Sequence, residues 1–215
     1  MTTRLRFPLL FLLLVLLLPR VNAEPAAPSA ATVETIVFVR HGEKPKEDRG
    51  QLTFQGLNRA LALPSVLIAK NGKANFIFAP CTGKIIHDGI PYSYVRPLVT
   101  IEPTAIRLGL PIEARYAYND IRGLQKALLA PQHQSSLIFV AWEHHQLEDL
   151  VKDILRSLGS DPAAVPEWPQ ADFDSIYVLR IRTLGKKQAV SFTHDHEGLN
   201  GQSLTSPKPA PKTAP

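Results

Sequence analysis

Short apolar runs alternate with amphipathic stretches along this chain, and the alternation limits the folds that it can adopt. The β-branched run Thr35–Val39 predicts a buried strand, and Leu137–Trp142 predicts another. Stretches with apolar residues at helical spacing lie between such runs, as in Gln146–Leu158. Two strand-like runs that flank Gly185 predict a hairpin near the end of the core. The sequence therefore predicts an α/β fold: a single-domain three-layer sandwich with a mostly parallel central sheet and helices on both faces.

Two of the predicted helices contain a proline. The first covers Thr53–Ala69 and contains Pro64, and the second covers Pro97–Leu108 and contains Pro103. Proline removes a backbone donor and crowds the preceding turn of a helix. We therefore expect a kink or break at both positions.

The first 23 residues have the pattern of a secretory signal peptide. Arg4 and Arg6 precede the apolar run Leu9–Leu18, which is short for a membrane span, and small residues lead up to Ala23. This pattern predicts cleavage after Ala23 and a periplasmic or secreted protein without stable membrane insertion. An uncleaved N-terminal anchor is the alternative, and it too would place the working domain outside the cytoplasm.

The segments on either side of the core have linker-like composition. Residues 24–33 are rich in Ala and Pro and read as a linker, and residues 198–215 read as a disordered Pro-rich tail. Residues 34–197 lie between them and are long enough for one domain with a real core.

Charge and cysteine content exclude several classes of protein. Loss of Arg4, Arg6 and Arg20 with the signal would lower the formal net charge from +5 to +2, and no run of Lys and Arg is present. Nucleic-acid binding is therefore not expected. Cys81 is the single cysteine, which excludes an intramolecular disulfide, and a cysteine-dependent phosphatase would need an arginine in a Cys-x5-Arg loop that this chain lacks.

A cation, an imidazole and a flexible backbone come together directly after the first predicted strand, in Arg40-His41-Gly42-Glu43. Sites in such sheets form where loops leave the carboxyl ends of strands. Three loops qualify here: Arg40–Glu43, Pro80–Arg96 and Glu143–Gln146. Each carries residues that could bind or attack a phosphate.

The order of these segments resembles the histidine phosphatase superfamily, also called phosphoglycerate-mutase-like, over roughly residues 34–182. Arg40–Glu43 resembles the nucleophile motif of that family. The other segments that carry the resemblance are Leu52–Ala60, Arg96–Thr100, Leu108–Ile112 and Val140–His144.

The resemblance implies a phosphoglycerate-mutase-like fold and a role for each matching residue. His41 would attack phosphorus and form a phosphohistidine intermediate that water hydrolyses. Arg40 and Arg96 would hold the phosphoryl oxygens, and His144 would donate to the same oxygens. The substrate-binding residues would be Gly42 and Glu43. No metal and no cofactor are expected, because the arginines supply the positive charge.

Two of these assignments have competitors in the sequence. The family places its second arginine closer to the second strand, where this chain has Lys84, and residues 82–94 read as an insertion. His145 competes with His144 for the place of the second histidine.

The proton donor to the leaving group is where the chain departs from the family. Glu143 and Asp120 are the two candidates that we weigh equally, although Asp120 is also an ordinary N-cap. Glu113 comes early for this role.

His194-Asp195-His196-Glu197 packs four potential metal ligands into four residues. Alternate residues of a strand share a face, so His194 and His196 could ligate one metal ion. The solvated end of a strand is the interpretation that we favour.

The sequence thus predicts a phosphomonoester hydrolase that acts through His41 on a small-molecule or envelope substrate. Periplasmic lipopolysaccharide-core heptose phosphatases are similar in size and location. The alternatives are a catalytically weak phosphate- or phosphoglycan-binding protein and a phosphoglycerate-mutase-type phosphotransferase. The sequence does not determine an oligomeric state.

Overall fold

A computed structural model of the protein describes residues 30–47, 49–87 and 90–207. The predicted signal peptide, residues 24–29 of the predicted linker and residues 208–215 of the predicted tail lie outside the described residues. Within the described part, no helix is both long enough and apolar enough to cross a membrane.

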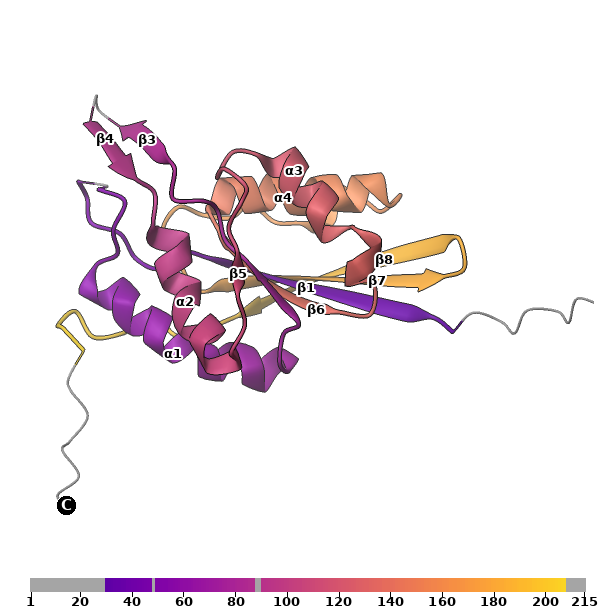
Figure 1. Ribbon diagram of the computed structural model, residues 1–215, viewed down its shortest axis with the longest axis horizontal. Coiled ribbons are helices and arrows are strands. Elements are labelled where there is room, and N and C mark those ends of the chain that lie inside the picture. Colours follow the sequence, from indigo (N-terminus) through magenta and orange to yellow (C-terminus); the bar gives the residue numbers. More distant parts are fainter. Residues whose placement is uncertain (1–29, 48, 88–89, 208–215) are drawn as a thin grey trace, which may run out of the picture.

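A six-stranded mixed sheet runs through the centre of the molecule in the order β5-β2-β6-β1-β7-β8 (Figure 1). The first four of these strands are parallel, and β7 and β8 are antiparallel additions beside β1. The strands are β1 (Thr32–Arg40), β2 (Phe76–Phe78), β5 (Ile112–Glu113), β6 (Leu137–Trp142), β7 (Ser175–Leu184) and β8 (Lys187–His196). The hairpin predicted around Gly185 is confirmed as β7–β8, and Gly185 has the positive φ of 59° that its turn requires.

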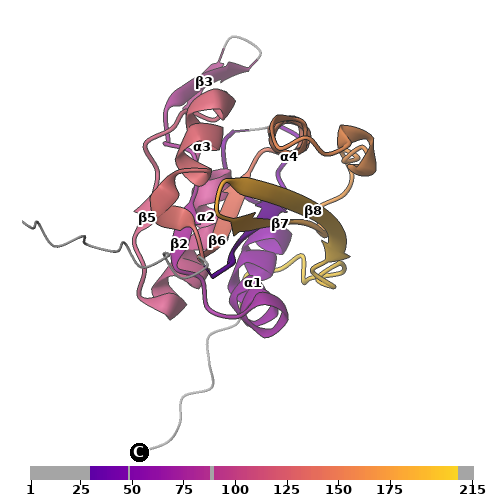
Figure 2. The same cartoon turned by 90° about the vertical axis from the view of Figure 1, so that its right-hand side faces the viewer.

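Helices cover both faces of the sheet (Figure 2). The helices α1 (Phe54–Asn71) and α2 (Arg96–Leu108) pack on one face, where β1 contributes Val37 and Val39. The helices α3 (Ile121–Leu128) and α4 (His144–Ser157) pack on the other, where β1 contributes Ile36 and Phe38. Strand β1 is thus apolar on both sides. The predicted three-layer α/β architecture is confirmed.

Neither proline ends its helix, so the expectation of a break is wrong at both positions. Pro64 lies inside α1 and Pro103 inside α2, and both helices continue past them. Pro64 is buried with Leu63 and Leu67 against the sheet, and this packing offsets the lost backbone hydrogen bond.

The predicted insertion at residues 82–94 forms a second, two-stranded sheet. Strand β3 (Lys84–His87) pairs antiparallel with β4 (Ile90–Ser93), and the hairpin projects beyond the N-terminal end of α2 (Figure 1). Two short 3₁₀ helices, η1 (Pro131–His133) and η2 (Pro162–Ala164), complete the fold.

The packed domain extends past residue 197, where we expected a disordered tail to begin. The Asp174 carboxylate accepts hydrogen bonds from the backbone of Gly198 and Leu199, and the Leu199 side chain is buried. Farther on, Asn58 of α1 donates to the carbonyls of Ser203 and Thr205, both at 2.9 Å. Neither the pattern of apolar residues nor the composition of the segment reveals such side-chain hydrogen bonds. The predicted end of the domain at residue 197 therefore falls too early.

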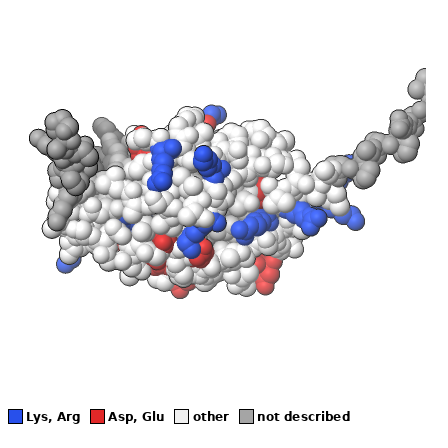
Figure 3. Space-filling model, turned by 90° about the horizontal axis from the view of Figure 1, so that it is seen from below, with Lys and Arg blue, Asp and Glu red and all other residues white. Residues whose placement is uncertain are grey.

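The surface has no simple charge pattern on the face that Figure 3 presents. Lys and Arg side chains are interspersed there with Asp and Glu. Exposed ion pairs such as Lys70–Asp195, at 3.1 Å, connect charges of opposite sign.

The first strand contains a buried acid, Glu34, that makes folding stability depend on pH. Burial raises the pKa of Glu34 from 4.5 to about 7, and its Oε1 has no hydrogen-bond partner among the described residues. The folded state therefore holds this proton more tightly than the unfolded state does. The contribution of Glu34 to folding stability is fully present below pH 4.5 and is lost as the pH rises through 7.

We therefore expect Glu34→Gln to stabilise the protein at pH 8 by about 2 kcal/mol and to have little effect at pH 4, because the amide never ionises. Urea unfolding of both proteins at the two pH values measures this difference. Glu102→Gln, at an exposed position of α2, is the matched control. An equal effect of Glu34→Gln on the free energy of unfolding at both pH values would refute the raised pKa of Glu34.

Candidate active site

The carboxyl ends of β1 and β6 lie side by side and bring two of the predicted loops together. Arg40 pairs in register with Trp142, and the next backbone N–H, that of His41, donates to the Trp142 carbonyl at 3.0 Å. Glu143 and His144 follow Trp142 directly. The parallel pairing thus places Arg40-His41 beside Glu143-His144, as the sequence predicts.

His41 is buried and held in one tautomer. Its Nδ1–H donates to the carbonyl of Gly42 at 2.8 Å, which leaves the lone pair on Nε2. Burial, followed by the charge of Arg96, lowers the pKa of His41 from 6.5 to about 3. The imidazole is therefore neutral at physiological pH and can act as a nucleophile through Nε2.

Gly42 lies where the loop meets two helices. Its N–H donates to Thr100 Oγ1 at 2.9 Å, and that hydroxyl donates to the Arg96 carbonyl at 2.8 Å. A Cβ on Gly42 would lie 2.9 Å from the Gly56 carbonyl oxygen, so the close approach of the two backbones requires glycine. Three separate motif segments therefore meet at this peptide.

Arg40 is buried beneath a loop that follows η2. Its Nη1 donates to the carbonyls of Gln170 at 2.7 Å and Asp172 at 2.8 Å, with a longer contact to Pro169 at 3.4 Å. Its guanidinium lies over the Phe173 ring, 3.9 Å from the centroid. Burial lowers the pKa of Arg40 to about 10, while Glu143 acts in the opposite direction, so Arg40 stays charged near neutral pH.

Arg96 is the first residue of α2 and is also buried. Its guanidinium lies 4.7 Å from the centre of the Tyr94 ring, and Tyr94 in turn makes an edge contact with His41 at 6.3 Å. The charge of Arg96 lowers the pKa of both His41 and Arg40, which shows that the three groups share one electrostatic environment. Lys84, the competing cation, lies on β3.

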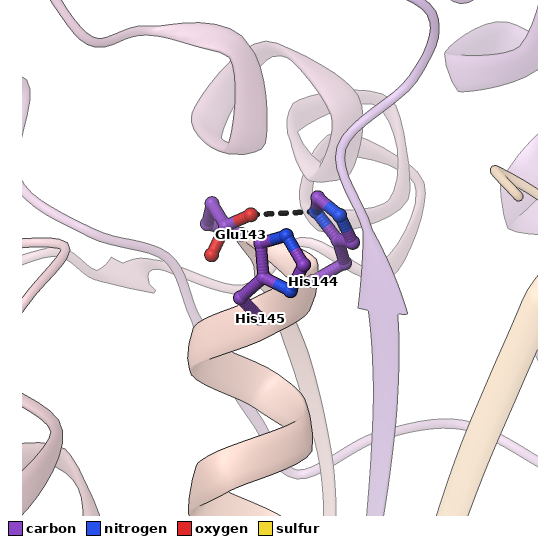
Figure 4. Close-up of side chains that lie close together, drawn as sticks. All are labelled: Glu143, His144 and His145. Carbon is purple, nitrogen blue, oxygen red and sulfur yellow. Dashed lines mark ion pairs between the residues drawn. The ribbon is translucent and has the colours of Figure 1, made fainter. Parts of the chain in front are cut away.

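Glu143 and His144 begin α4 (Figure 4). The Glu143 carboxylate caps the helix by accepting from the Gln146 backbone at 2.9 Å, and it lies 2.5 Å from His144 Nδ1. Burial disfavours the charge of Glu143, but these contacts outweigh it and lower its pKa to about 2. Glu143 is therefore ionised at neutral pH and has no proton to donate. His144 is buried, whereas His145 is exposed.

Glu143, His144 and His145 also lie close enough to be considered as metal ligands, since their donor atoms fall within 4.8 Å of one another (Figure 4). Two ligands of one tetrahedral zinc ion lie about 3.3 Å apart, given metal bonds of about 2.0–2.1 Å. The 2.5 Å contact between Glu143 and His144 is shorter than that separation. The geometry is that of a carboxylate–imidazole pair, so we assign no metal to it.

The other two candidate proton donors have different partners. The Asp120 carboxylate caps α3 by accepting from the Gly123 backbone at 3.0 Å. It lines a cavity of about 410 Å³ between α3 and α4, among residues that do not include His41. Glu113 lies on the edge strand β5 and pairs with Arg115. The charges that act on the pKa of His41 are those of Arg96, Arg40 and Glu143, and neither of these two acids is among them.

Glu43, which we expect in the substrate-binding set, pairs through its carboxylate with an arginine of α1. Its carboxylate accepts from Arg59 of α1 through both Nε and Nη2, at 2.8 to 3.1 Å. The contact ties Glu43 to the helix behind the loop. Gly42 shapes the site through its backbone, and Glu43 acts as a support.

Sequence reasoning missed the loop of residues 169–173, which supplies the acceptors for Arg40 and the ring of Phe173. Carbonyl groups carry no residue signature, so their part could not be read from the sequence. An Asp-x-Asp-Ser pattern at 172–175 is the available signal: the Asp172 carboxylate accepts from the backbone of Asp174 and Ser175 and from the Ser175 hydroxyl.

Three of the four candidate metal ligands at the end of β8 have polar partners elsewhere in the fold, and the fourth, His196, lies with its ring 4.8 Å from that of His194. His194 Nε2 lies 2.7 Å from the Ser175 hydroxyl, and Asp195 pairs with Lys70. Glu197 accepts from Arg59 at 2.6 Å. The strand end is therefore part of the hydrogen-bonded framework.

Comparison with known proteins gives structural neighbours only. The chain is similar in structure to several phosphatases. One, from Nakamurella multipartitia, is assigned as the phosphohistidine phosphatase SixA; it has 16% identity and a TM-score of 0.48, over 72% of this chain and 87% of that one. A phosphoserine phosphatase mutant from Entamoeba histolytica, in complex with phosphoserine, has 11% identity and a TM-score of 0.46, over 77% and 98%.

A second protein assigned as SixA, from Agrobacterium tumefaciens, has 11% identity and a TM-score of 0.41, over 74% of this chain and 97% of that one. No family model matches the sequence, and no curated protein matches it. At such identities and TM-scores, the likenesses do not assign a function.

We expect Arg96→Gln to raise the pKa of His41 from about 3, because the variant removes the charge that opposes protonation most strongly. The C2–H resonance of His41, followed by NMR from pH 8 to pH 3, measures the change. Arg107→Gln removes an exposed charge from the far end of α2 and should leave the titration unaltered. Equal titration curves for Arg96→Gln and the parent protein would show that Arg96 does not act on His41.

Proposed function

We propose that this protein is a histidine phosphatase, a phosphomonoester hydrolase that acts through a phosphohistidine on His41. The observation that carries the proposal is a buried, neutral imidazole with Nδ1 bonded to Gly42 and two buried arginines acting on it. The two arginines concentrate positive charge beside His41, and a dianionic phosphoryl group is complementary to that charge. The arrangement suits an anionic substrate that undergoes nucleophilic attack.

In the first step, His41 Nε2 forms a bond to phosphorus as the bond from phosphorus to the leaving oxygen breaks. The Nδ1–H bond to Gly42 stabilises the positive charge that develops on the ring. Arg40 and Arg96 stabilise the phosphoryl oxygens, and the buried His144 is the third candidate donor. In the second step, water attacks phosphorus and releases phosphate and neutral His41.

The leaving group receives little help from the residues that are described. Glu143 is ionised, and Asp120 and Glu113 have other partners. Protonation of a leaving group contributes about 10²–10⁴-fold in rate. The proposed enzyme therefore favours phosphoesters whose leaving groups are stable without a proton.

Export from the cytoplasm forms part of the proposal and rests on the signal-like residues 1–23. In the periplasm or outside the cell, the substrate would be a small phosphometabolite or an exposed phosphoryl group of the envelope. The same argument favours hydrolysis over phosphoglycerate-mutase chemistry as the function of the protein, since glycolytic substrates are scarce outside the cytoplasm.

The direct test is hydrolysis of p-nitrophenyl phosphate by residues 24–215. We expect His41→Ala to lower kcat by at least about 10⁴-fold, because it removes the nucleophile. His196→Ala, which removes an exposed histidine from the end of β8, is the control and should retain the parent rate. Turnover that survives in His41→Ala would refute the proposal.

Phosphate binding without turnover by the parent protein would instead support the alternative of a phosphate-binding module. Calorimetric titration with inorganic phosphate distinguishes the two. Under both readings, Arg96→Gln should weaken phosphate binding, because it removes one of the two buried cations.

We also expect the rate to depend steeply on the leaving group. Aryl phosphates of acidic phenols should react about 10²–10⁴-fold faster than alkyl phosphates, because their leaving oxygen needs no proton. A plot of the logarithm of the single-turnover rate constant against the pKa of the leaving group measures this dependence. A flat plot would show that an efficient general acid is present.

A further inference from the structure

Arg59 of α1 is fully buried among carboxylates from three distant parts of the chain. Besides Glu43, it donates through Nη1 to Glu197 at 2.6 Å and to Asp174 at 3.2 Å. These contacts outweigh the cost of burial and raise the pKa of Arg59 above its usual value. A buried guanidinium is tolerated only where its donors are satisfied, so the cluster fixes the relative positions of α1, β7 and the end of β8.

The cluster also holds the loop that carries His41. The Glu43 carboxylate is bound by Arg59, and the Glu43 carbonyl accepts from the Thr53 backbone at 2.8 Å. A Cβ on Gly56 would lie 2.5 Å from that same carbonyl oxygen, so the backbone of Glu43 is packed tightly on α1. Both the main chain and the side chain of Glu43 are therefore fixed.

The peptide between Gly42 and Glu43 contains the carbonyl that accepts from His41 Nδ1. On one side, the Gly42 N–H is held by Thr100. On the other side, Glu43 is held by Arg59. A rotation of this peptide would turn the acceptor away from Nδ1 and free the imidazole to change tautomer.

We propose that Arg59 is a positioning residue for His41. It acts through Glu43, and Asp174 and Glu197 fix its guanidinium from the opposite side. The inference rests on the proposed function in assigning catalysis to His41. The contacts themselves run from Arg59 to Glu43, and from the adjoining Gly42 carbonyl to His41 Nδ1. They determine the tautomer of the His41 ring, whether or not that ring is catalytic.

The proposal gives a role to the end of β8, which the phosphate site itself does not use. Burial raises the pKa of Glu197 to about 8, while Arg59, at 2.6 Å, acts to lower it. Glu43, Asp174 and Glu197 together surround the guanidinium of Arg59. Asp174 also holds the backbone of Gly198 and Leu199 at 3.1 and 2.7 Å, which fixes this chain segment behind the site.

The test uses Glu43→Gln and Arg59→Lys in residues 24–215. Gln keeps the size of Glu43 but loses the charge that binds both Nε and Nη2, and Lys keeps the charge of Arg59 but cannot reach three carboxylates. Asp195→Asn is the matched control, because Lys70–Asp195 also joins α1 to β8 but lies on the surface. Should Arg59→Lys fail to fold, Glu43→Gln alone decides the question.

Two readouts are needed: kcat and KM for p-nitrophenyl phosphate, and the ¹⁵N shifts of the His41 ring at pH 7. We expect Glu43→Gln to lower kcat by about 10- to 100-fold with little change in KM, and the ring to show a mixture of tautomers. The parent and Asp195→Asn should show protonated Nδ1 only. A folded Glu43→Gln variant with a single Nδ1–H tautomer would overturn the inference.

The two readouts separate this inference from the proposed function. A parent protein that does not hydrolyse the substrate refutes the phosphatase proposal, whereas the tautomer measurement still decides whether Arg59 positions His41.

Discussion

The hydrogen bond from His41 Nδ1 to the Gly42 carbonyl is the interaction on which the rest of the site depends. It selects the ring nitrogen that is free to react, and it requires the peptide after His41 to keep one orientation. Thr100 on α2 and the paired glycines Gly42 and Gly56 maintain that orientation. The helices α1 and α2, on one face of the sheet, thus determine which nitrogen of His41 is free to react at the end of β1.

Burial of charge is the second constraint. Arg40, Arg59 and Arg96 are each buried, and each has a different arrangement of partners. Arg40 is held by backbone carbonyls and Phe173, and Arg59 by three carboxylates. Arg96 lies over Tyr94 and acts electrostatically on His41. The framework stabilises Arg59 internally, while Arg40 and Arg96 concentrate positive charge at the reacting ring, which favours an anionic ligand there.

Much of the fold was predictable because its signals are local. Alternating runs predicted the layers, and parallel strands necessarily bring Arg40-His41 and Glu143-His144 to one edge of the sheet. The partners of individual side chains were less predictable. The Glu43 carboxylate pairs with Arg59 because that guanidinium is fully buried and needs anionic partners. Residues 169–173 bind Arg40 through backbone carbonyls, which no sequence pattern marks. The helices run through Pro64 and Pro103 because tertiary packing outweighs local propensity.

The measurement that tests this account most directly is the position of the phosphoryl group on the phosphoenzyme intermediate, trapped during turnover. Acid quenching must be avoided, since phosphohistidine is labile in acid; denaturation at alkaline pH, proteolysis and two-dimensional ³¹P–¹H NMR of the phosphopeptide identify the nitrogen. The account predicts phosphate on Nε2 of His41, because Nδ1 is bonded to the Gly42 carbonyl. Phosphate on Nδ1, on another residue, or turnover that passes through no phosphoenzyme would contradict it.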